Sequence, residues 1–368
     1  MNASSSPLSS AALQSLVGEL IDPNTGKSFA AARAVKSADI ADGKAQISVE
    51  LGYPAASQHA LIGKQIETAV LAQPGVSAAQ VSVTSRVVAH TVQGNVKLLP
   101  GVKNIVAVSS GKGGVGKSTT SANLALALAQ EGARVGILDA DIYGPSVPLM
   151  LGLSGQQPES EDGKTMIPLQ AHGVQANSIG FLIDTDQPMV WRGPMATQAL
   201  RQLLNETKWD DLDYLVIDMP PGTGDIQLTL AQSVPLTGAV IVTTPQDIAL
   251  LDARKGLMMF EKVGVPILGI VENMSIHICS NCGHAEHIFG SGGGEKMCAD
   301  YKVPFLGSLP LDITIREQAD SGTPTVVAAP DSAVAEAYRA IARQVAIAIA
   351  EKQRDLRHKF PSIVVQNT

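Results

Sequence analysis

A glycine-rich octapeptide at residues 111–118, Gly-Lys-Gly-Gly-Val-Gly-Lys-Ser, constrains the fold of this chain more than any other stretch. It fits the pattern G-x-x-x-x-G-K-[ST], in which backbone N–H groups surround phosphate oxygens. The apolar run 105–108 before it predicts a buried parallel strand, and residues 118–130 after it have a helical pattern. The octapeptide therefore precedes a helix N-terminus, where unpaired N–H groups and the helix dipole favour an anion.

This order of strand, loop and helix predicts a site for a nucleoside triphosphate with Mg²⁺. Lys117 is expected to lie against the β- and γ-phosphates, and the hydroxyl of Ser118 is expected to ligate Mg²⁺. The loop without a ligand would be only a glycine-rich turn. The residues predicted to bind the nucleotide are Gly111, Lys112, Gly113, Gly114, Val115, Gly116, Lys117, Ser118 and Thr119.

A second lysine, Lys112, directly follows the first glycine, although phosphate binding does not require it. In this respect the loop resembles the deviant Walker A signature of ATPases that dimerise around nucleotide. These include partition and division-site ATPases, the arsenite-pump ATPase, the nitrogenase iron protein and the Mrp/ApbC iron–sulfur carriers. The resemblance implies that Lys112 is catalytic: it would reach the phosphates of the partner subunit and stabilise transition-state charge in trans, as an arginine finger does. Otherwise Lys112 is an exposed loop lysine.

The composition is typical of a compact α/β enzyme. The chain has 368 residues, enough for two domains, with 45% hydrophobic and 17% charged residues. A net charge of −7 without a lysine or arginine cluster argues against nucleic acid as a partner. We find neither a secretory signal nor a run of 18 apolar residues, so we expect a cytoplasmic protein with no membrane partner.

The predicted elements divide the chain into two domains. Residues 1–92 form a small α/β domain, from a helix, a hairpin over 35–51, a helix over 57–73 and a strand over 81–88. Its pattern is similar to the assembly-factor domain that precedes many Mrp-type proteins. A linker follows at 93–104, then a P-loop ATPase domain at 105–357 and a C-terminal tail at 358–368. The ATPase domain ends in a helix predicted from 332 to about 356.

Strands and helices alternate throughout the second domain, which predicts a P-loop NTPase fold with a mostly parallel sheet and helices on both faces. The apolar strands are expected at 105–108, 135–138, 214–217, 239–242 and 267–271. In open α/β sheets ligands bind outside the carboxyl ends of the strands. The polar segments that follow these strands should therefore converge on one crevice.

Three carboxylates follow two of these strands. Asp139 and Asp141 are spaced to orient or deprotonate a water beside a metal-bound triphosphate. Their segment resembles the first switch of the deviant ATPases, which implies that Asp141 positions the water and that Asp139 lies nearer Mg²⁺. The alternative is that a carboxylate here only caps the next helix. Asp218 ends a strand one hundred residues after the loop, and this position predicts that it holds Mg²⁺.

Asn273 follows the strand at 267–271 and carries both an amide donor and an acceptor. This pair suits the exocyclic amine and a ring nitrogen of adenine, and in the families that the chain resembles this asparagine faces the base. A turn-forming asparagine is the alternative.

The chain has three cysteines, and two of them, Cys279 and Cys282, form a C-x-x-C pair. Two thiolates at this spacing can bind one metal from a single turn. Zinc would need two further ligands, which His277, His284 and His287 could supply, although at unusually short spacing. A 4Fe–4S cluster also needs four thiolates, which two chains on a twofold axis would provide. Cys298 is interpreted as a small buried filler.

The motifs of the second domain together resemble the Mrp/ApbC iron–sulfur cluster carriers over about residues 99–327. The similar segments are 191–195, 218–225, 243–246, 272–275, the cysteine pair, 288–290 and 292–294. Many members have proline where this chain has Ser280. The resemblance implies a homodimer that hydrolyses ATP and passes a labile 4Fe–4S cluster to apo-proteins. The rival hypotheses are a positioning ATPase of the partition type and an ATPase with a structural zinc site.

Overall fold

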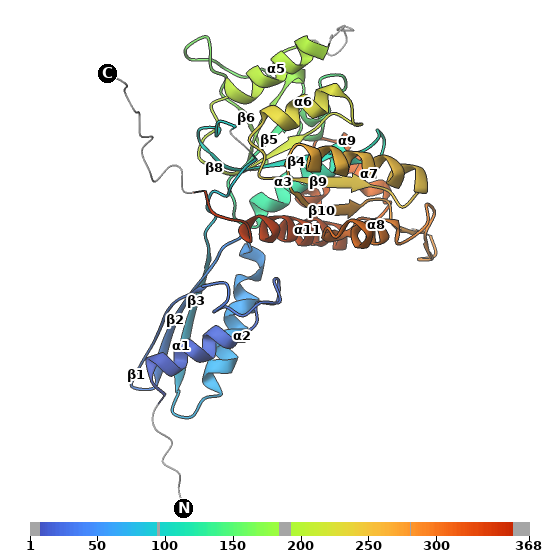
Figure 1. Ribbon diagram of the computed structural model, residues 1–368. Helices are drawn as coiled ribbons and strands as arrows, with labels where there is room; N and C mark the ends of the chain where they lie inside the picture. Colours follow the sequence, from blue (N-terminus) through green and yellow to red (C-terminus); the bar gives the residue numbers. More distant parts are fainter. Residues whose placement is uncertain (1–7, 94–95, 184–192, 280, 356–368) are drawn as a thin grey trace, which may run out of the picture. The chain divides into compact units, whose positions relative to one another are not determined.

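The computed structural model describes residues 8–93, 96–183, 193–279 and 281–355 (Figure 1). Trp191, Arg192, Ser280 and the expected tail at 358–368 lie outside these described residues. The chain divides into two compact units, one of residues 1–87 with 130–132, the other of 88–129 with 133–368.

The first unit packs two helices against a small sheet. Its strands are ordered β1-β2-β3, with β1 antiparallel and β3 parallel to β2. Alternate residues of β2 are buried, which places one face of the sheet in the core. The predicted hairpin and helices are confirmed, but the strand expected at 81–88 begins and ends three residues earlier. The elements are α1 (Ser10–Glu19), β1 (Val35–Ala41), β2 (Lys44–Leu51), η1 (Ala56–Gln58), α2 (His59–Leu71) and β3 (Ala78–Ser85).

The second unit is built on a sheet whose described strands are ordered β13-β10-β9-β4-β8-β5-β7-β6. Every pairing in this sheet is parallel except that of β6 with β7. The predicted mostly parallel sheet is therefore confirmed. The strands are β4 (Val102–Ser109), β5 (Val135–Asp139), β6 (Leu169–Ala171), β7 (Val174–Ser178), β8 (Leu212–Asp218), β9 (Gly238–Thr243), β10 (Ile267–Glu272) and β13 (Phe305–Ser308).

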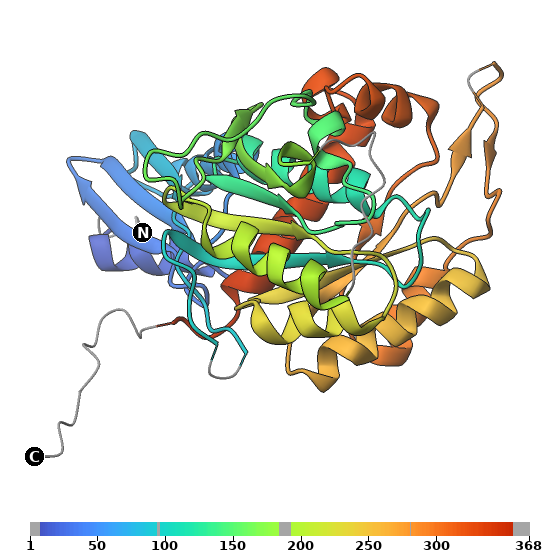
Figure 2. The same ribbon diagram turned by 90° about the horizontal axis from the view of Figure 1, so that it is seen from above.

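Helices cover both faces of this sheet, with α5, α6 and α7 on one face and α3 and α11 on the other (Figures 1 and 2). All seven residues of β8 are buried, as in a strand covered on both faces. The helices are α3 (Lys117–Gln130), α4 (Val147–Met150), η2 (Ile179–Phe181), α5 (Gly193–Asn205), α6 (Asp225–Ser233), α7 (Asp247–Lys262), α8 (Gly293–Tyr301), α9 (Ile313–Asp320), α10 (Thr325–Ala328) and α11 (Ala333–Ala350).

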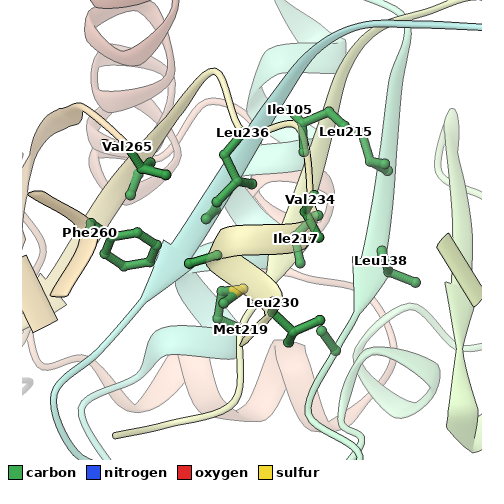
Figure 3. Packing of buried hydrophobic residues seen from close by; sticks show 14 of the residues in the cluster. Ile105, Leu138, Leu215, Ile217, Met219, Leu230, Val234, Leu236, Phe260 and Val265 are labelled. Atoms are coloured by element: carbon green, nitrogen blue, oxygen red, sulfur yellow. The ribbon is translucent and has the colours of Figure 1, made fainter. Parts of the chain in front are cut away.

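The core between the sheet and α5–α7 is mostly aliphatic. Figure 3 shows Leu138, Ile217 and Met219 of the sheet segments packed near Leu230 of α6. No helix among the described residues is both long and apolar enough to cross a bilayer.

The last helix is shorter than predicted: α11 ends at Ala350 rather than near 356. The following backbone pairs with residues 89–91, because the N–H of Thr91 donates to Gln353 O and the N–H of Asp355 donates to Ala89 O. This pairing satisfies backbone groups that a longer helix would have used internally.

Candidate functional site

The carboxyl ends of neighbouring strands bring the predicted site residues of the second unit together. The glycine-rich loop follows β4, Asp218 ends β8 and Asp139 ends β5. These strands are adjacent, and Asp139 and Asp218 are direct partners in the β5–β8 ladder. The strand ends thus bring the loop and two buried carboxylates together, as the alternating pattern predicts.

Two glycines of the loop have no room for a side chain. A Cβ on Gly111 would lie 2.1 Å from the carbonyl carbon of Asp252 in α7. Gly116 has φ of +80°, and a Cβ there would lie 2.1 Å from Nδ2 of Asn273. The loop therefore passes close under α7 and the segment after β10, and then enters α3 at Lys117.

Lys117 forms a buried ion pair with Asp218. Its Nζ lies 2.7 Å from Oδ1 of Asp218 and donates to the Ser118 hydroxyl at 3.0 Å. The side chains of Lys117 and Asp218 are 6% and 0% exposed. Each charge thus has its counter-ion in a region that excludes water, which a buried pair requires.

Ser121, which sequence reasoning missed, completes this cluster. Its hydroxyl lies 2.6 Å from Oδ1 of Asp218 and 3.0 Å from the carbonyl oxygen of Lys117. The sequence held one signal: Ser121 is four residues after Lys117 and therefore on the same face of α3.

The cluster fits a magnesium–nucleotide complex. Oδ2 of Asp218 is buried and has no hydrogen-bond partner among the described residues. A buried carboxylate oxygen without a partner is costly, and a metal-bound water would satisfy it. No three acidic, histidine or cysteine side chains of the described chain lie close enough to hold a metal ion. A carboxylate such as that of Asp218, together with phosphates and waters, is a ligand set that Mg²⁺ usually takes in proteins.

Asp139 caps the start of α4. Its Oδ2 accepts from the N–H groups of Ser146 and Val147 at 2.9 and 3.0 Å, and from the hydroxyl of Ser178 at 3.3 Å. Its Oδ1 accepts from the N–H of Asp141 at 3.1 Å. Burial, and secondly the charge of Asp218, raises the pKa of Asp139 to about 7. These contacts agree with the alternative that a carboxylate of this segment caps the next helix. That Asp139 lies near Mg²⁺ stays a prediction.

Asp141 and Lys112 are both partly buried. Burial raises the pKa of Asp141, and the nearby charge of Lys117 opposes that shift. Lys112 forms no ion pair with any described residue, and its carbonyl oxygen accepts from the Ser110 hydroxyl at 2.9 Å. The backbone of Lys112 is thus fixed by the loop, and contact of its ammonium with a partner subunit stays a prediction.

Asn273 braces the glycine-rich loop. Its Nδ2 donates to the carbonyl oxygen of Val115 at 2.9 Å, and its N–H donates to Thr243 O at 2.8 Å. One amide hydrogen is thus used within the protein, and contact with adenine stays a prediction.

Cys279 and Cys282 lie on a short hairpin of β11 (His277–Ile278) and β12 (Ala285–Glu286), which extends from the body of the unit in Figure 2. Cys279 is half-buried and Cys282 is exposed. The N–H of Cys279 donates to His284 O at 2.9 Å, which closes the turn. Hydrogen bonds from the backbone of Cys282 and Asn281 lower the pKa of the Cys279 thiol. Both thiols thus lie in one short turn, and metal binding by them stays a prediction.

Two of the three nearby histidines bind backbone rather than the cysteines. Nδ1 of His277 lies 3.0 Å from Leu311 O, and Nδ1 of His287 lies 2.6 Å from Ser275 O. In the described part of the chain, no group of three candidate metal ligands comes together around the cysteines. Cys298, in contrast, is buried in α8, and burial raises its pKa to about 11.

Family models match both units. Residues 101–346 match the ParA model described as NUBPL iron-transfer P-loop NTPase. Residues 10–83 match the model of an iron–sulfur cluster assembly protein.

The chain is similar to proteins named iron–sulfur cluster carrier protein. The one from Pseudomonas fragi is 62% identical over 278 residues, which are 75% of this chain and 97% of that protein. The one from Escherichia coli K12 is 67% identical over 246 residues, which are 67% of each chain.

Solved structures share the fold of the second unit. A nucleotide-binding protein from Archaeoglobus fulgidus, in complex with ADP, is 39% identical with a TM-score of 0.54. The match covers 60% of this chain and 87% of that one. The cell division ATPase MinD from Pyrococcus furiosus is 25% identical with a TM-score of 0.50, over 66% of this chain and 98% of that one. The predicted P-loop NTPase fold is therefore confirmed.

Proposed function

We propose that this chain, which belongs to the family of NUBPL iron-transfer P-loop NTPases, carries a 4Fe–4S cluster and delivers it to apo-proteins, with ATP binding and hydrolysis coupled to loading or release. The observation that carries the proposal is the presence, in one unit, of the lysine–carboxylate cluster under the phosphate loop and of two thiols on an extended hairpin. The carrier names of the relatives from Pseudomonas fragi and Escherichia coli support it.

ATP binding would exchange the buried ion pair for contacts with phosphate. The loop from Gly111 to Thr119 would surround the phosphates, and Lys117 would move from Asp218 to the β- and γ-phosphates. Ser118 and Asp218 would hold Mg²⁺, which neutralises the charge that develops on the phosphates. Once Lys117 has moved away, Asp218 would be free to face Mg²⁺. The hydroxyl of Ser121 would still donate to it and keep it oriented.

For hydrolysis we assign Asp141 to the attacking water and leave Asp139 beside the Mg²⁺ shell. Asp139 fixes the segment that carries Asp141, because it accepts the Asp141 N–H and caps α4. Burial raises the pKa of Asp141, and a carboxylate with a higher pKa is a stronger base toward the attacking water.

A homodimer would supply what one chain lacks at both sites. Lys112, which has no ion-pair partner within the described residues, would reach the phosphates of the other subunit. Two C-x-x-C hairpins on a twofold axis would offer the four thiolates that a 4Fe–4S cluster needs. The cluster is cargo, so its ligands should be accessible, and Cys282 is exposed.

The rival zinc hypothesis has less support, because no group of three histidine, cysteine or acidic side chains comes together in the part of the chain that the structure describes. The positioning-ATPase hypothesis shares the fold of the MinD structure but gives the hairpin thiols no role.

Anaerobic reconstitution with iron and sulfide tests the proposal. We expect a dimer with about two irons per chain, equivalent to one cluster for two subunits, and broad visible absorption. Cys279→Ala and Cys282→Ala should each lose this iron, whereas Cys298→Ala should retain it as the matched control, since Cys298 is buried away from the hairpin. Tightly bound zinc, with no visible absorption after reconstitution, would reverse the assignment.

A further inference from the structure

A cavity of about 280 Å³ lies between α5, α6 and the carboxyl ends of β5 and β8. Its walls are mostly aliphatic and include Leu138, Leu204, Ile217 and Leu230, each at most 3% exposed. Figure 3 shows three of these side chains, those of Leu138, Ile217 and Leu230, with Val234 nearby. Protein interiors are close-packed and hold few voids larger than a water molecule. A cavity of this size and lining is therefore suited to an apolar ligand, as smaller apolar cavities are known to be.

The cavity is not apolar throughout. Arg201 and Asn205 of α5 are exposed, and Ser233 of α6 is half-buried; these three residues also line it. The Arg201 guanidinium has no hydrogen bond or ion pair with any residue that the structure describes, although its carbonyl oxygen accepts from Nδ2 of Asn205 at 2.7 Å. A guanidinium that no described residue pairs with, beside an aliphatic cavity, matches a ligand with an apolar chain and an anionic end.

We propose that this cavity binds a small amphiphile with a free carboxylate. The alkyl chain would lie between α5, α6 and the sheet, where its apolar surface is removed from water. The carboxylate would lie at the rim and accept charge-assisted hydrogen bonds from Arg201, with Asn205 and Ser233 beside it. This site is separate from the residues assigned to nucleotide and cluster, so it does not depend on the proposed function.

The cavity borders two segments that carry carboxylates of the candidate nucleotide site. Its lining includes Ala140, between Asp139 and Asp141, and Met219, directly after Asp218. The alkyl chain would therefore contact the segments that carry the site carboxylates.

Calorimetric titration of the full chain with decanoate, kept below its micelle concentration, tests the proposal. We expect saturable binding of one decanoate per chain, and much weaker binding of decanol, which has the same alkyl chain without the charge. Arg201→Gln should weaken decanoate binding about 10- to 100-fold, the range expected for loss of a hydrogen bond to a charged group. Arg316→Gln, an exposed arginine of α9 outside the cavity, is the matched control and should bind as the unchanged chain does.

Ser233→Phe provides a second test, because an aromatic ring at this half-buried position should occupy part of the cavity and abolish binding. Absence of saturable binding, or equal affinity in the unchanged chain and Arg201→Gln, would overturn the proposal, and Arg201→Gln decides this even where Ser233→Phe does not fold. Anionic phospholipid vesicles form the last arm of the experiment. Binding to vesicles without binding to free decanoate would indicate a lipid surface instead and would also overturn it.

Discussion

Asp139 combines capping, burial and charge on a single carboxyl group. It accepts the N–H groups at the start of α4, yet it is fully buried beside Asp218, its partner across the β5–β8 ladder. Burial and the second carboxylate both favour the protonated form, which is why the pKa of Asp139 rises to about 7.

The raised pKa of Asp139 predicts a pH dependence of stability in the metal-free chain. The folded state holds this proton above pH 3.8, where the unfolded carboxyl has lost it, so the stabilising effect of protonation fades as pH rises toward about 7. Relative to Asp139→Asn, the unchanged chain should lose at most about 1.4 kcal/mol of unfolding free energy per pH unit between these values. Urea unfolding at several pH values measures this difference. Parallel curves for the two proteins would show that Asp139 is ionised throughout, and Asp320→Asn, on an exposed residue of α9, is the control.

A second residue-scale prediction concerns Ser121. Ser121→Ala removes the hydroxyl that lies 2.6 Å from Oδ1 of Asp218, so Asp218 would be less well oriented for Mg²⁺. We expect Mg²⁺ to increase the affinity for ADP about 10-fold less in this variant than in the unchanged chain. This is within the range measured when a residue that orients a metal ligand is removed. Titration of ADP with and without Mg²⁺ checks it. Thr229→Ala, which removes an exposed hydroxyl bonded only within α6, should leave both affinities unchanged; a similar loss there would assign the effect to helix stability.

At the scale of elements, the cysteine hairpin is fastened to the body of its unit mainly by backbone carbonyls. His287 contacts Ser275 O and His277 contacts Leu311 O, while the N–H of Leu311 donates to Ile276 O at 2.8 Å. These contacts hold the base of the hairpin and leave its thiol-bearing turn exposed.

This fastening predicts that His287→Ala shortens the lifetime of the cluster without removing its ligands. The hairpin should lose one hydrogen bond that holds its base. A chelator should therefore remove iron from the reconstituted cluster several-fold faster, while the initial iron content and the ATPase rate stay the same. His284→Ala is the matched control, since no described residue bonds the His284 ring. Equal acceleration in both variants would instead indicate that the histidines contact the cluster themselves.

Local patterns predicted the elements that are determined locally. The five strands predicted in the second unit are short apolar runs, and each of these five is found in place. The strands β6, β7 and β13 of the same sheet were not predicted. The end of α11 was predicted too late because residues 353–355 pair with 89–91, far away in sequence. Ser121 was missed for the same reason, because its partner Asp218 lies 97 residues away in the sequence. The capping role of Asp139 depends on where residues 146 and 147 fold, which no local pattern contains.

At the scale of the whole molecule, one chain would carry only part of the groups that the proposed cluster binding and ATP hydrolysis require. It offers two hairpin thiols where a 4Fe–4S cluster needs four, and Lys112 of its phosphate loop has no ion-pair partner among the described residues. A twofold axis would complete both sets at once, because each subunit would donate the same groups that it receives.

Mixed dimers test this symmetry directly. Lys112→Ala leaves a subunit that still has Lys117, and Lys117→Ala leaves one that still has Lys112, so each variant is expected to be nearly inactive alone. If Lys112 acts in trans, a mixed dimer has one complete site, formed by the loop of the first variant and Lys112 of the second. An equal mixture should recover about a quarter of the wild-type ATPase rate, because half of the dimers are mixed and each has one working site of two. A mixture no more active than Lys112→Ala alone would place the action of Lys112 within its own subunit, and the case for a nucleotide site shared across the axis would then be lost.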